Sequence, residues 1–229
     1  MKTMTRKKLL SVLLALACVF TQTAAEAFIS GDAPVITVDG TEITWAELKA
    51  EVRLELFLGA LRCAGYGYAL DIVDPLTIED EMDKVMFAME DRIATLSLVQ
   101  ENGITLAEED LLRAKEAAAE EWRQYRDIAF SDNGLAYLPA GDYEPADDPE
   151  ENVTKYFASF GLTEDALYAR ACADLLEEKL RAAYTAGMEG TDEELRMAYI
   201  DWTLEAYYEA EIFEDWDAVE RLQETLWED

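Results

Sequence analysis

The sequence predicts a mainly α-helical domain that begins with a β-hairpin. Two short runs of alternating apolar and polar residues flank Asp39-Gly40, a dipeptide that supplies the positive φ angles of a two-residue type I′ turn. Downstream, pairs of Thr and Glu spaced three residues apart recur close behind glycines, which is typical of capped helix starts. Between these starts, apolar residues recur every three or four positions. We therefore expect a hairpin followed by about seven helices.

The first helix is expected over residues 45–64, directly behind the hairpin. Thr44 and Glu47 match a capping box, in which each side chain accepts a hydrogen bond from the amide of the other residue. Gly65 and Gly67 end the pattern. One face of this helix carries Leu48, Val52, Leu56 and Gly59.

The next two helices are expected over residues 78–101 and 106–130. Their predicted caps are Thr77 with Asp80 and Thr105 with Glu108. The earlier helix has the spacing of an amphipathic helix, with apolar residues at Ile78, Met82, Val85, Met89, Ile93 and Leu96. The later helix has a predicted buried stripe of Leu111, Ala114, Ala118, Trp122 and Tyr125.

Residues 131–151 lose this periodicity and contain three prolines, two glycines and many acidic residues. We expect an acidic loop here, either a mobile flap or a solvated insertion. The remaining helices are expected over residues 152–160, 164–186 and 191–213, followed by a last one that ends near Trp227. Thr191 with Glu194 caps the third of these, and Asp217 caps the last.

Residues 1–27 match a Sec-type export signal. Four basic residues precede an apolar stretch over residues 9–20, and Ala25-Glu26-Ala27 matches an A-x-A cleavage site. The apolar stretch is shorter than the roughly 20 residues that span a bilayer. Cys18 raises lipoprotein anchoring as an alternative, but the residues before it fit a lipobox poorly because the expected leucine is one position out of place. We expect a secreted, cell-surface or periplasmic protein without stable membrane insertion.

The chain behind the signal is long enough for one domain, which we place at residues 28–213, with residues 214–229 as a C-terminal helix packed on it. The whole sequence has 19 basic and 50 acidic residues and a net charge of −31. Such a chain repels phosphate backbones and anionic lipid, so nucleic acid is excluded as a partner. No segment matches an Asp-x-Asp-x-Asp-Gly calcium loop. The acidity is expected to keep the protein dispersed in solution.

The sequence contains no histidine. This excludes Ser-His-Asp triads, Cys-His pairs and the usual zinc ligand sets. The sequence also contains no Gly-rich phosphate loop. We therefore expect neither a cofactor nor a metal ion. The abundant carboxylates leave a carboxylate-pair hydrolase as the enzymatic alternative.

Two cysteines, Cys63 and Cys172, remain behind the signal and lie on separate predicted helices. An exported chain with an even number of cysteines can close a disulfide. The alternative is that both are small, unbridged core residues. The sequence leaves both open because a bridge requires Cα atoms within about 7 Å of each other.

Four motifs follow one another along the chain: Val-Asp-Gly-Thr-Glu-Ile-Thr, Glu-Asn-Gly-Ile-Thr-Leu-Ala-Glu-Glu-Asp, Gly-Leu-Thr-Glu-Asp-Ala-Leu and Gly-Thr-Asp-Glu-Glu-Leu-Arg-Met-Ala-Tyr. In this order, over residues 33–199, the chain resembles the N-terminal chaperone domain of SurA and PrsA foldases, a helical module of the trigger-factor-like type. The resemblance implies a module that holds unfolded polypeptide outside the cytoplasm. In that family a parvulin-type prolyl isomerase domain usually follows. Here only 30 residues follow the last motif and histidine is absent, so the resemblance implies a chaperone without isomerase activity.

Apolar side chains are the candidate binding residues. Met82, Met86 and Met89 lie on one side of the helix over residues 78–101, and methionine adapts its shape to varied partners. Aromatic residues crowd the C-terminal part of the chain, namely Tyr199, Trp202, Tyr207, Tyr208 and Trp216. Both groups also fit an ordinary core. They form a binding surface only if the last helices leave a concavity open.

The expected function is non-catalytic binding of unfolded or partly folded secreted polypeptides through an apolar groove. The alternative from another class is a structural or assembly subunit whose apolar face is covered by a fixed protein partner or by a second copy of the chain. An open apolar groove favours the chaperone, whereas a flat, self-complementary patch favours self-association.

Overall fold

The computed structural model describes residues 33–131 and 134–228, which form eight helices and three strands. The chain is mainly α-helical, as predicted. The predicted export signal, including Cys18, lies outside the described residues. In chain order the elements are β1 (Pro34–Val38), β2 (Thr41–Thr44), α2 (Trp45–Gly65), α3 (Pro75–Glu101), α4 (Glu108–Phe130), α5 (Gly134–Tyr137), α6 (Pro149–Ala158), α7 (Glu164–Thr185), α8 (Asp192–Glu209), β3 (Ile212–Glu214) and α9 (Trp216–Thr225).

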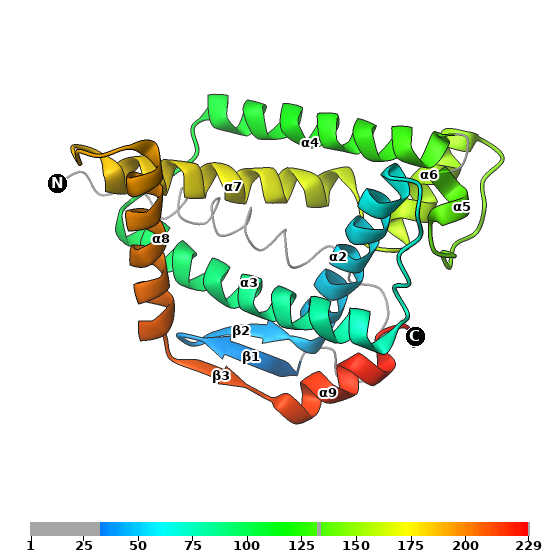
Figure 1. Cartoon of the computed structure of the whole chain (residues 1–229), viewed down its shortest axis with the longest axis horizontal. Coiled ribbons are helices and arrows are strands. Elements are labelled where there is room, and N and C mark those ends of the chain that lie inside the picture. The colour runs from blue at the N-terminus through cyan, green and yellow to red at the C-terminus, as the bar shows by residue number, and fades with distance from the viewer. Residues whose placement is uncertain (1–32, 132–133, 229) are drawn as a thin grey trace.

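The helices are arranged around the long central helix α3 (Figure 1). Helices α4 and α7 run side by side on one side of it, and the sheet and α9 lie on the other. Helix α2 runs from the sheet toward α4, and α8 crosses the end of α3. Among the described residues, no helix combines the length and the apolar character needed to cross a membrane.

The predicted hairpin is confirmed. Asp39 and Gly40 have φ angles of 48° and 78°, as a type I′ turn requires. Strands β1 and β2 pair antiparallel on either side of this turn, with Val38 opposite Thr41. The inward-facing Val35, Ile36, Val38 and Ile43 are buried, so the hairpin contributes to the core.

Strand β3 contradicts the predicted helix over residues 191–213. Helix α8 ends at Glu209, and Ala210 is already extended, with φ −66° and ψ 143°. The Glu211 amide donates a hydrogen bond of 2.8 Å to the Asp39 carboxylate, and Ile212–Glu214 then pairs antiparallel with β1. The order of strands is β2-β1-β3. This pairing joins residues about 175 positions apart, which local sequence patterns do not reveal.

Helix α2 begins with the predicted capping box. The Glu47 amide donates to Thr44 Oγ1 (3.3 Å), and the Thr44 amide donates to Glu47 Oε2 (2.8 Å). The face predicted to be apolar is buried, apart from the half-buried Gly59, and the other sides carry further buried residues: Leu54, Phe57, Leu58, Ala60 and Leu61. Phe57 stacks on Phe160 at 4.3 Å and meets Tyr156 and Phe157 edge-on. Helix α2 is therefore the centre of the core.

The starts of α3, α4 and α9 also differ from the prediction, while the Thr191–Glu194 box of α8 is confirmed. Helix α3 begins at Pro75, and Asp74 accepts the Thr77 amide (3.0 Å), because proline favours the first helical position. Helix α4 begins at Glu108; its N-cap is an alanine whose amide donates to Asp110 Oδ2 (2.7 Å), so Thr105 caps nothing. Asp215, and not Asp217, caps α9.

The antiparallel helices α4 and α7 form the most extensive helix pair (Figure 1). Ala114, Ala118 and Trp122 are buried as predicted, and small alanines allow the two helices to approach closely. Leu111 is exposed, which corrects its predicted place on the buried stripe. At this end of the pair, the Lys179 ammonium group contacts the buried Asp110 carboxylate at 2.6 Å.

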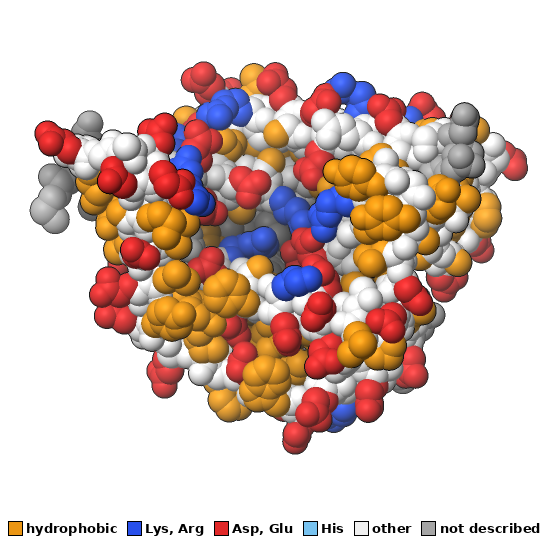
Figure 2. Space-filling view, in the orientation of Figure 1, with side chains coloured by type: hydrophobic (Ala, Val, Ile, Leu, Met, Phe, Trp, Pro, Cys, Tyr) orange, Lys and Arg blue, Asp and Glu red, His pale blue; other side chains and the backbone are white. Residues whose placement is uncertain are grey.

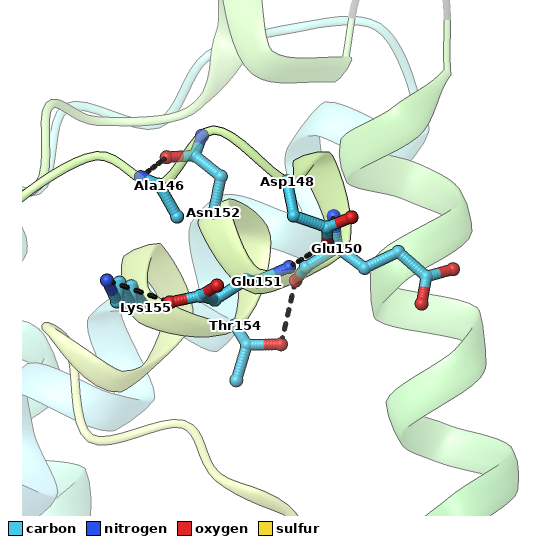
Figure 3. Close-up of polar contacts among 7 residues, drawn as sticks. All are labelled: Ala146, Asp148, Glu150, Glu151, Asn152, Thr154 and Lys155. Atoms are coloured by element: carbon cyan, nitrogen blue, oxygen red, sulfur yellow. Dashed lines mark hydrogen bonds and ion pairs between the residues drawn. The ribbon is translucent and has the colours of Figure 1, made fainter.

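The acidic segment over residues 131–151 has more structure than predicted, apart from residues 132–133, which lie outside the described part of the chain. It contains the short helix α5, and α6 begins inside it at Pro149. Figure 3 shows the start of α6, where Asp148 Oδ1 accepts the amides of Glu150 (3.0 Å) and Glu151 (2.9 Å). Asn152 accepts the Ala146 amide at 3.0 Å and so fastens the preceding turn.

The C-terminal segment packs onto the domain. Four of its side chains belong to the main core, together with side chains of α2, α3 and the hairpin: Ala218, Val219 and Leu222 of α9, and Leu226 directly after it. The predicted boundary between residues 213 and 214 falls inside β3. The hairpin and the C-terminal segment are therefore parts of one packed unit.

Candidate functional site

The three methionines proposed to bind a client lie in the core. Met82, Met86 and Met89 of α3 are each 3% exposed or less. They belong to the main core cluster with residues of β1 and α2. Their spacing places them on one face of α3. Such a face can pack in the interior or bind a partner, so the sequence pattern did not distinguish a core from a binding surface. Without rearrangement of α3, they cannot contact a partner.

Tyr199 and Trp202 fasten α8 to α7. Tyr199 is buried in a second, smaller core with Val99, Leu176 and Leu180. Trp202 stacks on Tyr184 of α7, with ring centroids 4.3 Å apart and planes 6° apart. Burial raises the pKa of Tyr199 above its ordinary value, because ionisation would place a charge in this core. These two residues therefore stabilise the fold and do not line an open groove.

Outside this second core, three of the predicted aromatic residues lie near the surface: the half-buried Tyr207 and the exposed Tyr208 and Trp216. The Tyr207 ring meets Phe87 of α3 edge-on at 5.1 Å and Tyr208 at 5.5 Å. Phe87 and Tyr208 are 47% and 77% exposed, and Phe213 of β3 and Trp216 of α9 are 66% and 54% exposed. We call these five side chains the aromatic surface: Phe87, Tyr207, Tyr208, Phe213 and Trp216.

Figure 2 shows hydrophobic side chains gathered over α8 and the sheet, on the same face of the molecule. The residues of the aromatic surface come from four elements. Three of them, α8, β3 and α9, follow one another in the chain, and α3 packs against α8 and α9. Sequence reasoning missed Phe87, because it lies off the apolar stripe of α3, and Phe213, because its strand was predicted to be helix. An aromatic residue outside an amphipathic stripe is the signal that could have identified Phe87.

A buried carboxyl group lies beneath the aromatic surface. Glu90 of α3 is 2% exposed, and its Oε2 accepts a hydrogen bond of 2.9 Å from the Tyr207 hydroxyl. Its Oε1 has no partner among the described residues. Burial, opposed by the Tyr207 hydrogen bond and assisted by the neighbouring Glu214 carboxylate, raises the pKa of Glu90 to about 7. Glu90 lies four residues after Met86, and this spacing could have placed it on the buried face.

Ion pairs join α2 to α3 and α7. The Arg170 guanidinium of α7 lies 2.9 Å from Glu51 and 2.6 Å from Glu55, and Arg92 of α3 lies 3.9 Å from Glu51. Figure 2 shows a hollow between α7 and α3 whose walls carry side chains of both signs. A small pocket of about 210 Å³, lined largely by charged residues of α2 and α3, lies between those two helices.

Further carboxyl groups of α3 and α7 have raised pKa values. Burial raises the pKa of Asp91, Asp174 and Glu177, while Arg92 opposes the rise in each case. The charges of Asp91 and Asp174 also raise the pKa of Glu177, so acidic groups crowd this face of α3 and α7. Among the described residues, no group of histidine, cysteine, Asp and Glu side chains has the geometry to hold a metal ion.

Cys63 of α2 and Cys172 of α7 are free thiols in this structure. Both are half-buried, so neither the bridge nor a fully buried core position describes them. Burial raises the pKa of the Cys172 thiol, which disfavours the reactive thiolate.

Comparison of the chain with models of protein families, with curated proteins and with solved structures found no match.

Proposed function

We propose that this protein is an exported, non-catalytic chaperone-like protein that binds unfolded or partly folded polypeptides through the aromatic surface. The observation that carries the proposal is the exposure of four large aromatic side chains: Phe87 and Tyr208, which contact the Tyr207 ring, and Phe213 and Trp216, which lie on the segment after α8. Burying one such ring against a client contributes on the order of 2 kcal/mol. Aromatic rings accept many apolar partners, so this binding is weak and broad.

The charge of the protein also supports the proposed chaperone-like function. With a net charge of −31, it attracts basic client segments and keeps a complex with an unfolded client in solution. The resemblance to the SurA and PrsA chaperone domain and the signal-like residues 1–27 point in the same direction. The binding surface differs from the groove expected from the sequence, because the methionines and Tyr199 are buried.

In the assembly-subunit alternative, the aromatic surface is covered by a fixed protein partner or by a second copy of the chain. Strand β3 is an edge strand, and Phe213 lies exposed on it. An exposed edge can pair with a strand of a second copy or of a fixed partner. Stable self-association of the purified protein, lost when the aromatic surface is altered, is the outcome that favours this alternative.

The hydrolase alternative requires an accessible pair of carboxyl groups with different pKa values. Glu90 and Glu214 are neighbouring carboxyl groups, but Glu90 is 2% exposed beneath Tyr207. A substrate cannot reach it without displacement of α8. We therefore propose no hydrolytic reaction for this pair.

An aggregation-suppression assay on a reduced, unfolding client tests the proposed function. The surface variant replaces Tyr208, Phe213 and Trp216 by Ser, and the control variant replaces three exposed apolar residues elsewhere, Tyr66, Tyr68 and Leu76, by Ser. We expect suppression by the wild-type and control proteins and its loss in the surface variant. No suppression by equimolar wild-type protein would sink the proposal. Proline isomerisation is measured alongside, and a measurable rate would refute the absence of catalysis.

A further inference from the structure

A pocket of about 480 Å³ lies apart from the aromatic surface, in the range typical of small-ligand sites. It lies where the loop after α2 passes α5, the end of α6 and the end of α9 (Figure 1). We call it the loop pocket, and it is lined by Arg53, residues 69–73, residues 136–140, Asp142, Ser159 with Phe160, and Trp227. Most of its wall is therefore apolar or aromatic.

Hydrogen bonds and close packing join the segments that line the loop pocket. The Trp227 indole donates a hydrogen bond of 3.2 Å to the Ile72 carbonyl, and the Tyr156 hydroxyl donates one of 2.6 Å to the Pro139 carbonyl. A Cβ atom on Gly141 would lie 2.7 Å from the Tyr156 ring, so the loop presses closely on α6. The pocket therefore exists before a ligand arrives, which lowers the entropic cost of binding.

Arg53 is the basic residue in the lining of this pocket. Its guanidinium carbon lies over the Trp227 ring, 5.2 Å from the centroid. Although the sequence has 50 acidic residues, no carboxylate of the described residues lies within ion-pair distance of Arg53. Its N–H groups are thus available to a ligand, and the planar guanidinium matches a carboxylate in a bidentate pair.

Two carboxylates complete the polar part of the lining, Asp71 and Asp142. Asp71 Oδ1 accepts the Val73 amide at 3.2 Å, and further oxygens of the pair can accept N–H groups from a ligand. One arginine and two carboxylates repel a dianion such as a phosphate monoester. They suit a monocarboxylate that also carries an N–H donor.

We propose that the loop pocket binds the C-terminal residue of a polypeptide when that residue is apolar. Arg53 pairs with the terminal carboxylate, Leu70, Phe160 and Trp227 contact the side chain, and the aspartates face the backbone N–H groups. The choice of a polypeptide as the ligand rests on the proposed function, but the pocket is separate from the aromatic surface. An N-acylated apolar amino acid shares the same chemistry.

Calorimetric titration of the whole protein tests this proposal with the peptide acetyl-Ala-Ala-Ala-Phe. We expect the free acid to bind and its C-terminal amide to bind at least about tenfold more weakly, as loss of a charge-assisted pair predicts. Arg53→Gln removes this preference, whereas Arg62→Gln, on an exposed turn of the same helix, keeps it. Ala140→Trp, at an exposed position of the lining, weakens both peptides by filling the pocket.

Equal affinity for the acid and the amide, or an unchanged preference in Arg53→Gln, would overturn the proposal. Acetyl-phenylalanine binding as tightly as the tetrapeptide would mark a site for small carboxylates and overturn the assignment to polypeptides. Thermal unfolding shows whether each variant is folded. If Arg53→Gln does not fold, Ala140→Trp still tests the proposal. The surface variant with Ser at Tyr208, Phe213 and Trp216 retains tetrapeptide binding, so failure of the chaperone assay and failure of this proposal are distinguishable.

Discussion

The Tyr207 hydroxyl of α8 donates a hydrogen bond of 2.9 Å to the carboxyl group of Glu90, which is buried on α3. This bond joins residues 117 positions apart and holds the end of α8 against the central helix. It also fixes the Tyr207 ring against Phe87 at the base of the aromatic surface. The geometry of the proposed binding surface therefore depends on a buried ionisable group.

Glu90→Gln is expected to stabilise the protein in a pH-dependent way. The folded state raises the pKa of Glu90 from 4.5 to about 7, so the folded protein holds this proton more tightly than the unfolded chain. The stability from this proton is present below pH 4.5 and is lost as pH rises through 7, an effect of up to about 3 kcal/mol. Glutamine stays neutral, so we expect a gain in the free energy of unfolding near pH 8 and little change near pH 4.

Urea unfolding from about pH 4 to pH 8 measures this difference. Because the whole chain is acidic, removing any negative charge relieves some repulsion. Glu116→Gln, on the exposed face of α4, removes one charge without touching a buried group and serves as the control. A difference between the two variants that does not change with pH would contradict the assignment of the buried proton to Glu90.

Tyr207→Phe is expected to have the opposite effect above neutral pH. It removes the hydrogen bond that lowers the pKa of Glu90, so the pKa rises further and the ionised carboxylate loses a partner. We expect a loss of about 1–3 kcal/mol in the free energy of unfolding at alkaline pH. In the background of Glu90→Gln, the loss is smaller because the lost bond is then to a neutral group. An identical loss in both backgrounds would show that the carboxylate does not matter.

Thr44→Ala and Thr105→Ala separate a real helix cap from an apparent one. Both threonines precede a Glu by three residues, but only Thr44 accepts an amide hydrogen bond in the structure. We expect Thr44→Ala to cost about 1 kcal/mol and Thr105→Ala to cost much less. Chemical denaturation gives both values. Equal costs would contradict the assignment of Ala107, and not Thr105, as the N-cap of α4.

Arg170→Met is expected to destabilise the protein by about 2 kcal/mol or more. The substitution leaves Glu51 and Glu55, both half-buried, without the guanidinium that lies between them. Arg196→Met breaks an exposed pair with Glu193 within α8 and should cost much less, because solvent screens this pair. Comparison of the two unfolding free energies checks the claim. Similar small costs would show that the ion pairs between α2 and α7 do not hold the helices together.

Features with a local cause were predictable from the sequence. The Asp39-Gly40 turn and the Thr44 cap depend on residues within four positions of one another, and both were confirmed. Strand β3 depends on an open edge of β1 far away in the chain, and a local pattern rich in aromatic residues gave a helix instead. Helix α3 begins at Pro75 and not at the predicted Ile78, because Asp74-Pro75 is a stronger helix-start signal than Thr77.

The candidate site was less predictable than the fold. The methionines and Tyr199 have the spacing of a buried face, and only the packing of α2, α7 and the sheet around α3 decides that they are interior. Tyr207, Tyr208 and Trp216 were among the predicted aromatic residues, whereas Phe213 and Phe87, which contacts the Tyr207 ring, were missed. A surface built from four elements has no single periodicity.

Affinity for a permanently unfolded, fluorescently labelled client tests the central claim most directly. Fluorescence anisotropy is compared for the wild-type protein, the surface variant with Ser at Tyr208, Phe213 and Trp216, and the control variant with Ser at Tyr66, Tyr68 and Leu76. We predict binding by the wild-type and control proteins and a loss of about tenfold or more in the surface variant. Equal affinity of all three proteins, or no binding by the wild-type protein, would contradict the account.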